Sequence, residues 1–161
     1  GLHFTPEILS DIAAKGVREA AVTLHVGPGT FKPVSVENAE EHQMHSEEYF
    51  LTPATAELVN ATHRAGKRVL AVGTTTVRVL ESCAAEDGTV VPGHGKTEIF
   101  LYPPRQIRAV DMLLTNFHLP KSTLLMLVSC FCDREKVLAA YAAAIEAKMR
   151  FYSYGDCMLL I

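Results

Sequence analysis

One short stretch combines polar groups that chemistry can use with the start of an apolar run. Asn116 and His118 follow residues 110–114, whose Val, Leu and Met content is typical of a buried strand. Pro120 lacks an N–H, and Ser122 can accept a hydrogen bond from a free amide of the next turn, so we predict a helix that begins near Ser122. An amide and a histidine at a strand end, above a helix N-terminus, are typical of ligand sites in α/β folds.

A second candidate site is the glycine turn Gly73-Thr74-Thr75, which carries Arg78 one helical turn later. Hydroxyl groups, free amides at a helix N-terminus and a guanidinium suit a carboxylate or a phosphate. In the alternative interpretation Thr74 only caps the helix and Arg78 pairs with Glu81. The chain contains neither the P-loop pattern nor the dinucleotide-binding glycine fingerprint.

Histidine and glutamate recur at short spacing in the pattern His42-x-x-His45-x-Glu47. With His25 and His118 as further ligands, these residue types could hold zinc or iron. A solvated polar loop is the plainer interpretation, because the run 36–48 has no apolar face and is too ionisable to be core. A third interpretation needs no metal: the same groups act as acid, base or hydrogen-bond partner for a substrate.

Two further loops carry candidate groups. The glycines and prolines that follow His25, in residues 27–33, permit close backbone approach and forbid a regular element. Near the C-terminus, Tyr154 and Asp156 place an aromatic face beside a carboxylate, which suits a cation or a stacked base. The alternative for this segment is a simple turn before the last strand.

The elements that must position these groups alternate along the chain. Capping hydroxyls precede proline at Thr5 and Thr52, where we predict helices. The spacing of apolar residues predicts further helices after Thr74, Ser122 and Asp133, and strands over 20–26, 68–72, 98–102, 110–114 and the end of 152–161. We therefore predict one α/β domain over residues 1–161, with alternating helices and short, largely parallel buried strands that form an open sheet or a partial barrel.

Composition limits the function classes. The chain has 161 residues, 48% of them hydrophobic, and a formal charge of −3, so it has no overall basic field for nucleic acid. Any RNA contact must be local. Four cysteines without a C-x-x-C pair predict a cytoplasmic, disulfide-free protein, and no apolar run is long enough to span a membrane. The chain begins without a methionine, so we expect a fragment. The candidate RNA-contact clusters are Arg64-Lys67-Arg68, Arg105-Arg108 and Lys148-Arg150.

Several runs spread over the whole chain resemble one family closely, the S-adenosylmethionine:tRNA ribosyltransferase-isomerases of the queuosine pathway. Pro28 departs from that family's pattern, and Pro103-Pro104-Arg105 replaces a glycine-containing turn. The runs that carry the resemblance are GLHFT at 1–5, TLHVGPGTFKPV at 23–34, HQMHSE at 42–47, VGTTTVRVLE at 72–81, LTNFHLPKSTLLMLVS at 114–129 and FYSYGD at 151–156.

The resemblance implies transfer and isomerisation of the ribosyl part of S-adenosylmethionine. The acceptor is 7-aminomethyl-7-deazaguanine in the anticodon wobble position of tRNA, and the products are epoxyqueuosine-tRNA, adenine and methionine. S-Adenosylmethionine is then a co-substrate, with no metal, no membrane partner and a monomeric enzyme expected. The family's enzymes are about twice as long. This chain would be their C-terminal part, without the early α/β elements and an inserted β-barrel region.

Such a reaction needs a base, an acid, and groups that hold the methionine carboxylate and the sulfonium. Our hypothesis assigns proton transfer to His45, Glu47 or His118, without dividing the roles among them. The alternatives are a non-catalytic module that binds S-adenosylmethionine or tRNA, an inactive remnant, or a metal-dependent hydrolase. Substrate binding is assigned to Thr74, Thr75 and Arg78 for an anionic group, to Tyr154 and Asp156 for a cation, and to His25, Gly27, Gly29, Thr30, Phe31, Gly73, Asn116, Ser122 and Thr123 around them.

Overall fold

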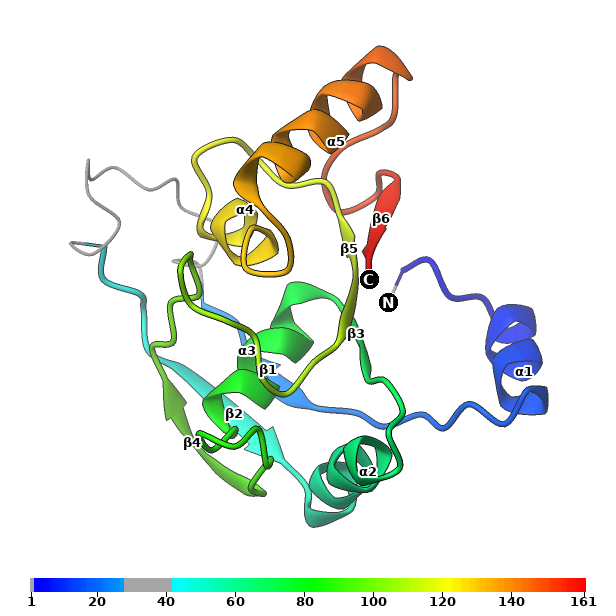
Figure 1. Cartoon of the computed structure of the whole chain (residues 1–161), viewed down its shortest axis with the longest axis vertical. Helices are drawn as coiled ribbons and strands as arrows, with labels where there is room; N and C mark the ends of the chain where they lie inside the picture. The colour runs from blue at the N-terminus through cyan, green and yellow to red at the C-terminus, as the bar shows by residue number, and fades with distance from the viewer. Residues whose placement is uncertain (1, 28–41) are drawn as a thin grey trace.

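The computed structural model describes residues 2–27 and 42–161 (Figure 1). Six strands form two three-stranded sheets, with the orders β1-β2-β4 and β3-β5-β6. The elements in chain order are α1 (Pro6–Ala14), β1 (Thr23–His25), β2 (Glu47–Leu51), α2 (Pro53–Arg64), β3 (Leu70–Val72), α3 (Thr74–Ser82), β4 (Gly93–Thr97), β5 (Met112–Asn116), α4 (Thr123–Val128), α5 (Arg134–Glu146) and β6 (Cys157–Leu160).

The α/β class is confirmed, but the prediction of largely parallel strands in one open sheet or partial barrel is wrong for the described residues. The sheet β1-β2-β4 is antiparallel throughout, and in the second sheet only β3 and β5 run parallel, because β6 pairs antiparallel with β5. The order of helices and strands along the chain does not determine strand direction. Alternating helices and strands are typical of parallel sheets, but antiparallel strands with one polar face, such as β4, can occur in the same order.

Helix starts follow local chemistry. The side-chain oxygens of Thr5, Thr52 and Ser122 each accept a hydrogen bond from the backbone amide three residues later, at 3.3, 3.1 and 3.2 Å. These bonds satisfy amides that have no partner within the helix, so the predicted starts of α1, α2 and α4 are confirmed. Within the described part of the chain, no helix has the length and hydropathy needed to cross a bilayer.

Two predicted boundaries are wrong. The strand predicted over 98–102 lies earlier, as β4 (Gly93–Thr97), because pairing with β2 selects those residues despite their glycines. The polar run 36–48, predicted to be a solvated loop, contains the start of β2, and Glu47 is only 1% exposed. In both places a partner strand distant in sequence decides the structure, so local propensity misleads.

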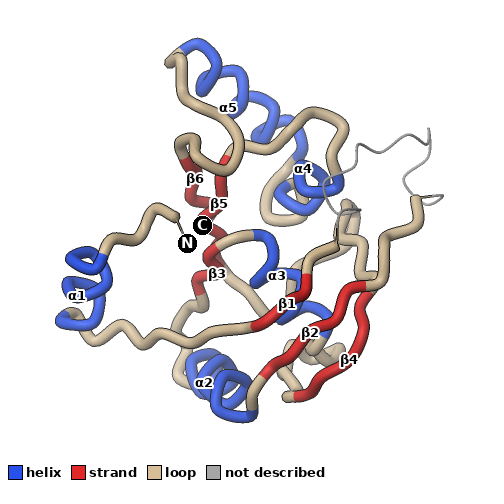
Figure 2. Tube along the Cα trace, turned by 180° about the vertical axis from the view of Figure 1, so that it is seen from behind, coloured by secondary structure: helices blue, strands red, loops and turns tan. Residues whose placement is uncertain are grey.

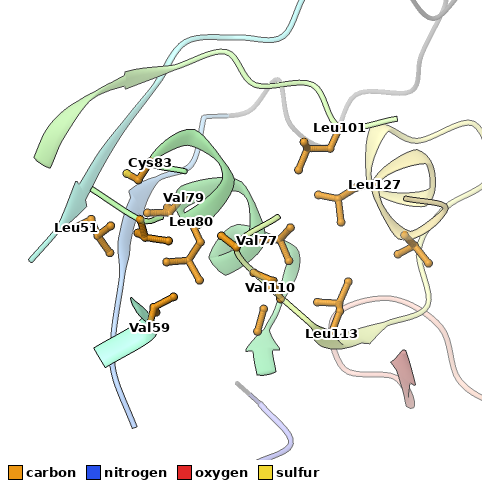
Figure 3. Close-up of a cluster of buried hydrophobic side chains, with 14 of the residues drawn as sticks. Leu51, Val59, Val77, Val79, Leu80, Cys83, Leu101, Val110, Leu113 and Leu127 are labelled. Atoms are coloured by element: carbon orange, nitrogen blue, oxygen red, sulfur yellow. The ribbon is translucent and has the colours of Figure 1, made fainter. Parts of the chain in front are cut away.

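Helix α3 lies between the two sheets and joins them (Figure 2). Its residues Val77 and Leu80 are fully buried and belong to the same hydrophobic cluster as Leu51 of β2 and Leu113 of β5 (Figure 3). One core therefore includes side chains from both sheets. The four cysteines are free thiols, as predicted.

A buried ion pair also links the first sheet to α3. The Arg78 guanidinium on α3 donates through Nη1 to Oε2 of Glu47 at the start of β2, and the two side chains are 3% and 0% exposed. The other carboxylate oxygen, Oε1, accepts a hydrogen bond of 2.9 Å from the backbone N–H of Gly27, just after β1. The carboxylate of Glu47 thus connects β1, β2 and α3.

We expect Glu47→Gln to lower the free energy of unfolding by about 3–5 kcal/mol, because the amide leaves a buried guanidinium without its counter-charge. The glutamine oxygen can still accept a hydrogen bond from the Gly27 N–H, so the decrease in stability measures the effect of removing the negative charge. Urea unfolding followed by circular dichroism at pH 7 measures it.

The matched control is Glu57→Gln, which breaks the Arg64–Glu57 pair on the surface of α2. That pair has side chains 62% and 67% exposed, so its loss should cost no more than about 1 kcal/mol. Equal decreases in the free energy of unfolding in the two variants would show that burial does not determine how much the Glu47–Arg78 pair stabilises the fold.

Candidate functional site

The turn between β3 and α3 depends on the backbone conformation of Gly73. Gly73 has φ +86°, which favours glycine, and its N–H donates to the carbonyl of Leu114 on β5 at 2.8 Å. Gly73 occupies the N-cap position, and no side chain caps the helix there. Thr74 therefore does not cap α3 as the alternative interpretation held. The N-terminus of α3 therefore lies beside the end of β5, and a helix N-terminus suits an anion.

The alternative interpretation also paired Arg78 with Glu81, and the structure does not show this pair. The Glu81 carboxylate is 4% exposed and accepts hydrogen bonds from the backbone N–H groups of Arg108 and Ala109 at 2.8 and 2.7 Å. Arg78 instead meets Glu47. Both acidic side chains thus anchor distant backbone segments against the same helix.

His118 lies just beyond β5 in a largely buried position. Its Nε2 is 3.0 Å from the Thr115 hydroxyl, and its backbone N–H donates to the Tyr141 hydroxyl at 2.9 Å. Burial disfavours the charged ring and lowers the pKa of His118 to about 4. At neutral pH the imidazole is therefore uncharged, so it can accept a proton or a hydrogen bond.

Asn116, at the end of β5, connects this region to the C-terminal turn. Its side-chain amide donates to the carbonyls of Gly155 and Asp156 at 3.2 and 3.3 Å. Gly155 has no room for a side chain, because a Cβ would lie 2.3 Å from the carbonyl oxygen of Arg150. The turn around 150–156 is therefore close-packed, and Asn116 holds it beside the end of β5.

The two groups predicted to hold a cation sit on that turn. Tyr154 is 88% exposed, so its ring face is open. The Asp156 carboxylate accepts from the Arg150 N–H at 2.7 Å and lies 3.6 Å from the Arg150 guanidinium, and the backbone hydrogen bond lowers its pKa. Asp156 is therefore ionised at neutral pH and already oriented by Arg150.

The histidine and glutamate side chains around β2 diverge. His45 is exposed, whereas the Glu47 carboxylate turns inward to Arg78. The His42 ring instead contacts Phe100, with centroids 5.2 Å apart. His25 is an exposed residue of β1 opposite Glu48. Across residues 2–27 and 42–161, no three His, Cys, Asp or Glu side chains converge as a metal site would require, so the described structure gives the metal interpretation no support.

The structure places two of the predicted loops next to each other, the turn at Gly73 and the segment that follows β5. Val72 pairs with Leu114 across the parallel strands, so Gly73 and Thr115 lie side by side, with His118 bonded to Thr115. The end of β1 is linked to α3 through Glu47, and β1 also contacts α3 directly. Gly29, Thr30 and Phe31 lie outside the described residues.

The groups predicted at the start of α4 are buried. The Ser122 hydroxyl donates to the carbonyl of Leu119 at 2.8 Å and caps the helix, and Thr123 is 4% exposed. One contributor escaped the sequence analysis: the Tyr141 hydroxyl positions the His118 backbone from α5, 23 residues away. No local signal in the sequence pointed to this hydrogen bond, because its partners lie on separate elements.

The whole chain is similar to known proteins of one family. The family model described as "Queuosine biosynthesis protein" matches residues 1–160. A relative from Moorella thermoacetica is 55% identical over 161 residues, covering 100% of this chain and 47% of its own length. A second, from Natranaerobius thermophilus, is 56% identical over 160 residues, 99% of this chain and 47% of its own length. Both are named S-adenosylmethionine:tRNA ribosyltransferase-isomerase.

A solved structure agrees with these relatives. The crystal structure of an S-adenosylmethionine tRNA ribosyltransferase from Thermotoga maritima superposes with a TM-score of 0.79 at 41% identity, covering 99% of this chain and 50% of that one. The chain thus spans about half the length of the relatives it matches. The resemblance seen in the sequence motifs is confirmed, and the chain belongs to the queuosine biosynthesis protein family.

Proposed function

We propose that this chain takes part in transfer and isomerisation of the ribosyl moiety of S-adenosylmethionine to 7-aminomethyl-7-deazaguanine in the tRNA wobble position. The products would be epoxyqueuosine-tRNA, adenine and methionine. The observation that carries the proposal is a family match over residues 1–160, with identity above 50% to relatives named for this activity. S-Adenosylmethionine is the co-substrate in this proposal, and tRNA is the second substrate.

The chain is, in this proposal, a single domain from the C-terminal portion of a longer, monomeric, cytoplasmic enzyme. Its coverage of about half of each relative supports that view. The same coverage favours a second candidate function: the chain alone binds S-adenosylmethionine or tRNA without catalysing the reaction. The remaining half would then complete the catalytic site.

His118 is the candidate proton acceptor that the described structure orients best, because Thr115 and Tyr141 hold it beside the β3–α3 turn. Burial lowers its pKa to about 4, so the ring is uncharged at neutral pH and a weaker base than free imidazole. An uncharged, oriented imidazole can remove a proton next to the sulfonium of S-adenosylmethionine. His45 is exposed, and it is the candidate for the acid that protonates the departing adenine.

The anionic end of the co-substrate suits the start of α3. The amides and hydroxyls of Thr74 and Thr75 are the proposed partners of the methionine carboxylate, because a helix N-terminus favours negative charge. Arg78 adds positive charge one turn away, but its pairing with Glu47 supports a positional role for both. In that role Glu47 holds Gly27 and the loop that follows it.

The cationic groups suit the C-terminal turn. The open ring of Tyr154 and the ionised carboxylate of Asp156 are the proposed contacts of the sulfonium or of the aminomethyl group. Asn116 would act through the turn it holds rather than by contact with substrate. This proposal needs no metal ion.

We expect adenine release from S-adenosylmethionine when the chain is joined to the remaining half of the Moorella thermoacetica relative. The assay contains tRNA bearing 7-aminomethyl-7-deazaguanine and follows adenine by liquid chromatography. Omission of the modified base is the control. A folded fusion that binds S-adenosylmethionine in a calorimeter but never releases adenine would reject the enzyme in favour of the binding module.

In the same fusion, we expect His118→Gln to lower kcat by a factor of about 10²–10⁴, the usual contribution of a general base. Glutamine keeps a hydrogen-bonding group but cannot take up a proton. His94→Gln, on the exposed face of β4, is the matched control and should leave kcat unchanged. Normal turnover of His118→Gln would remove the imidazole from the mechanism.

The low pKa of His118 also predicts a pH-dependent stability. The folded pKa of about 4 lies below the unfolded value of 6.5, so the unfolded state binds the proton first and stability falls as pH drops from about 6.5 to 4. Between pH 7 and 5 the free energy of unfolding of the unaltered chain should fall by about 2 kcal/mol more than that of the His118→Gln variant, measured by urea unfolding. Equal losses in both proteins would contradict the buried, uncharged ring.

A further inference from the structure

Three aromatic side chains form a row on the surface beside the first sheet. The ring of Phe100 lies between those of His42 and Tyr102, with centroids 5.2 and 4.7 Å away and planes tilted by 58° and 39°. All three rings are half-buried, so part of each is open to solvent. We call these three residues the aromatic row. None of them belongs to the candidate site described above.

The row is held by its neighbours. Leu101 is 2% exposed and points into the core beside Leu127 (Figure 3). Leu101 belongs to the hydrophobic cluster and Ile99 packs against it, whereas Phe100 and Tyr102 lie outside that cluster and contact each other. The Arg105 N–H donates to the Tyr102 carbonyl at 3.1 Å, and this turn connects the row to Arg105 in the wall of a neighbouring depression.

The turn opens onto a surface depression of about 630 Å³. Its walls include Pro103, Pro104, Arg105, Phe131 and Arg134. The wall also carries two carboxylates, Asp133 and Glu135, and Asp133 pairs with Lys136 at 3.1 Å. The depression thus combines apolar faces with two guanidinium groups and two carboxylates.

We propose that the aromatic row and this depression bind unpaired nucleotides of the tRNA anticodon loop that flank the wobble base. The inference rests on the proposed function. A formal charge of −3 provides no general attraction for RNA, so affinity must come from a local surface. Aromatic rings stack on unpaired bases, and arginine both stacks and contacts phosphate, which is the combination present here.

The experiment measures binding of the purified chain to a fluorescein-labelled anticodon stem–loop carrying 7-aminomethyl-7-deazaguanine, by fluorescence anisotropy. Phe100→Leu and Tyr102→Leu keep apolar volume but remove the rings. Each should weaken binding by about 5- to 160-fold, given a stacking contribution of roughly 1–3 kcal/mol per base. Phe50→Leu removes an aromatic ring that is 49% exposed on β2, and it should bind as the unaltered chain does.

The arginine is tested through salt dependence. Arg105→Gln should lower the slope of log affinity against log salt concentration by about 0.7, the value for one phosphate contact on a single strand. Arg18→Gln, an exposed arginine outside the depression and outside the candidate RNA-contact clusters, is the control and should leave the slope unchanged.

Unaltered stem–loop affinity in both ring variants would overturn the inference and assign the aromatic row to packing against other polypeptide. That result leaves the proposed function intact, because adenine release by the fusion protein is measured separately. A failure of the proposed function appears instead as a fusion that never releases adenine. Weakened stem–loop binding with unchanged affinity for S-adenosylmethionine, measured by calorimetry, would support the inference.

Discussion

The buried contact between Glu47 and Arg78 is the constraint on which the arrangement of this chain depends. Removing two charges from water costs several kcal/mol per ion, and that cost is offset only by close pairing and further hydrogen bonds. Here the carboxylate meets both the guanidinium on α3 and the N–H of Gly27. The end of β1, the start of β2 and the helix that joins the two sheets are therefore tied at one point. A displacement of α3 away from β2 would separate the two charges of this buried pair.

The remaining candidate groups depend on the parallel pair β3 and β5. Because these strands end at the same edge, the Gly73 turn and the Thr115–His118 segment lie side by side. His118 then combines burial, which keeps it uncharged, with two hydrogen bonds that orient it. The start of α3, an uncharged imidazole and the C-terminal turn held by Asn116 are thus brought to one end of the second sheet. These are the groups that we propose to hold S-adenosylmethionine.

The two proposed binding functions belong to two different surfaces of the chain. The end of the second sheet carries groups suited to a small, charged co-substrate. The aromatic row and the depression beside Arg105 lie on a different segment and suit unpaired bases. A reaction that joins a small molecule to a base within an RNA loop needs both kinds of surface. The chain spans about half of its relatives' length, so the other half would contribute further walls to each.

The sequence by itself determined the local structure and the family. Capping hydroxyls at Thr5, Thr52 and Ser122 act on amides three residues away, so they marked the helix starts correctly. The motif runs identified the family because they preserve residue types in order. Tertiary structure alone decided the strand directions, the position of β4 and the burial of Glu47. These depend on partners distant in sequence, and a glutamate is buried only where folding supplies a counter-charge such as Arg78.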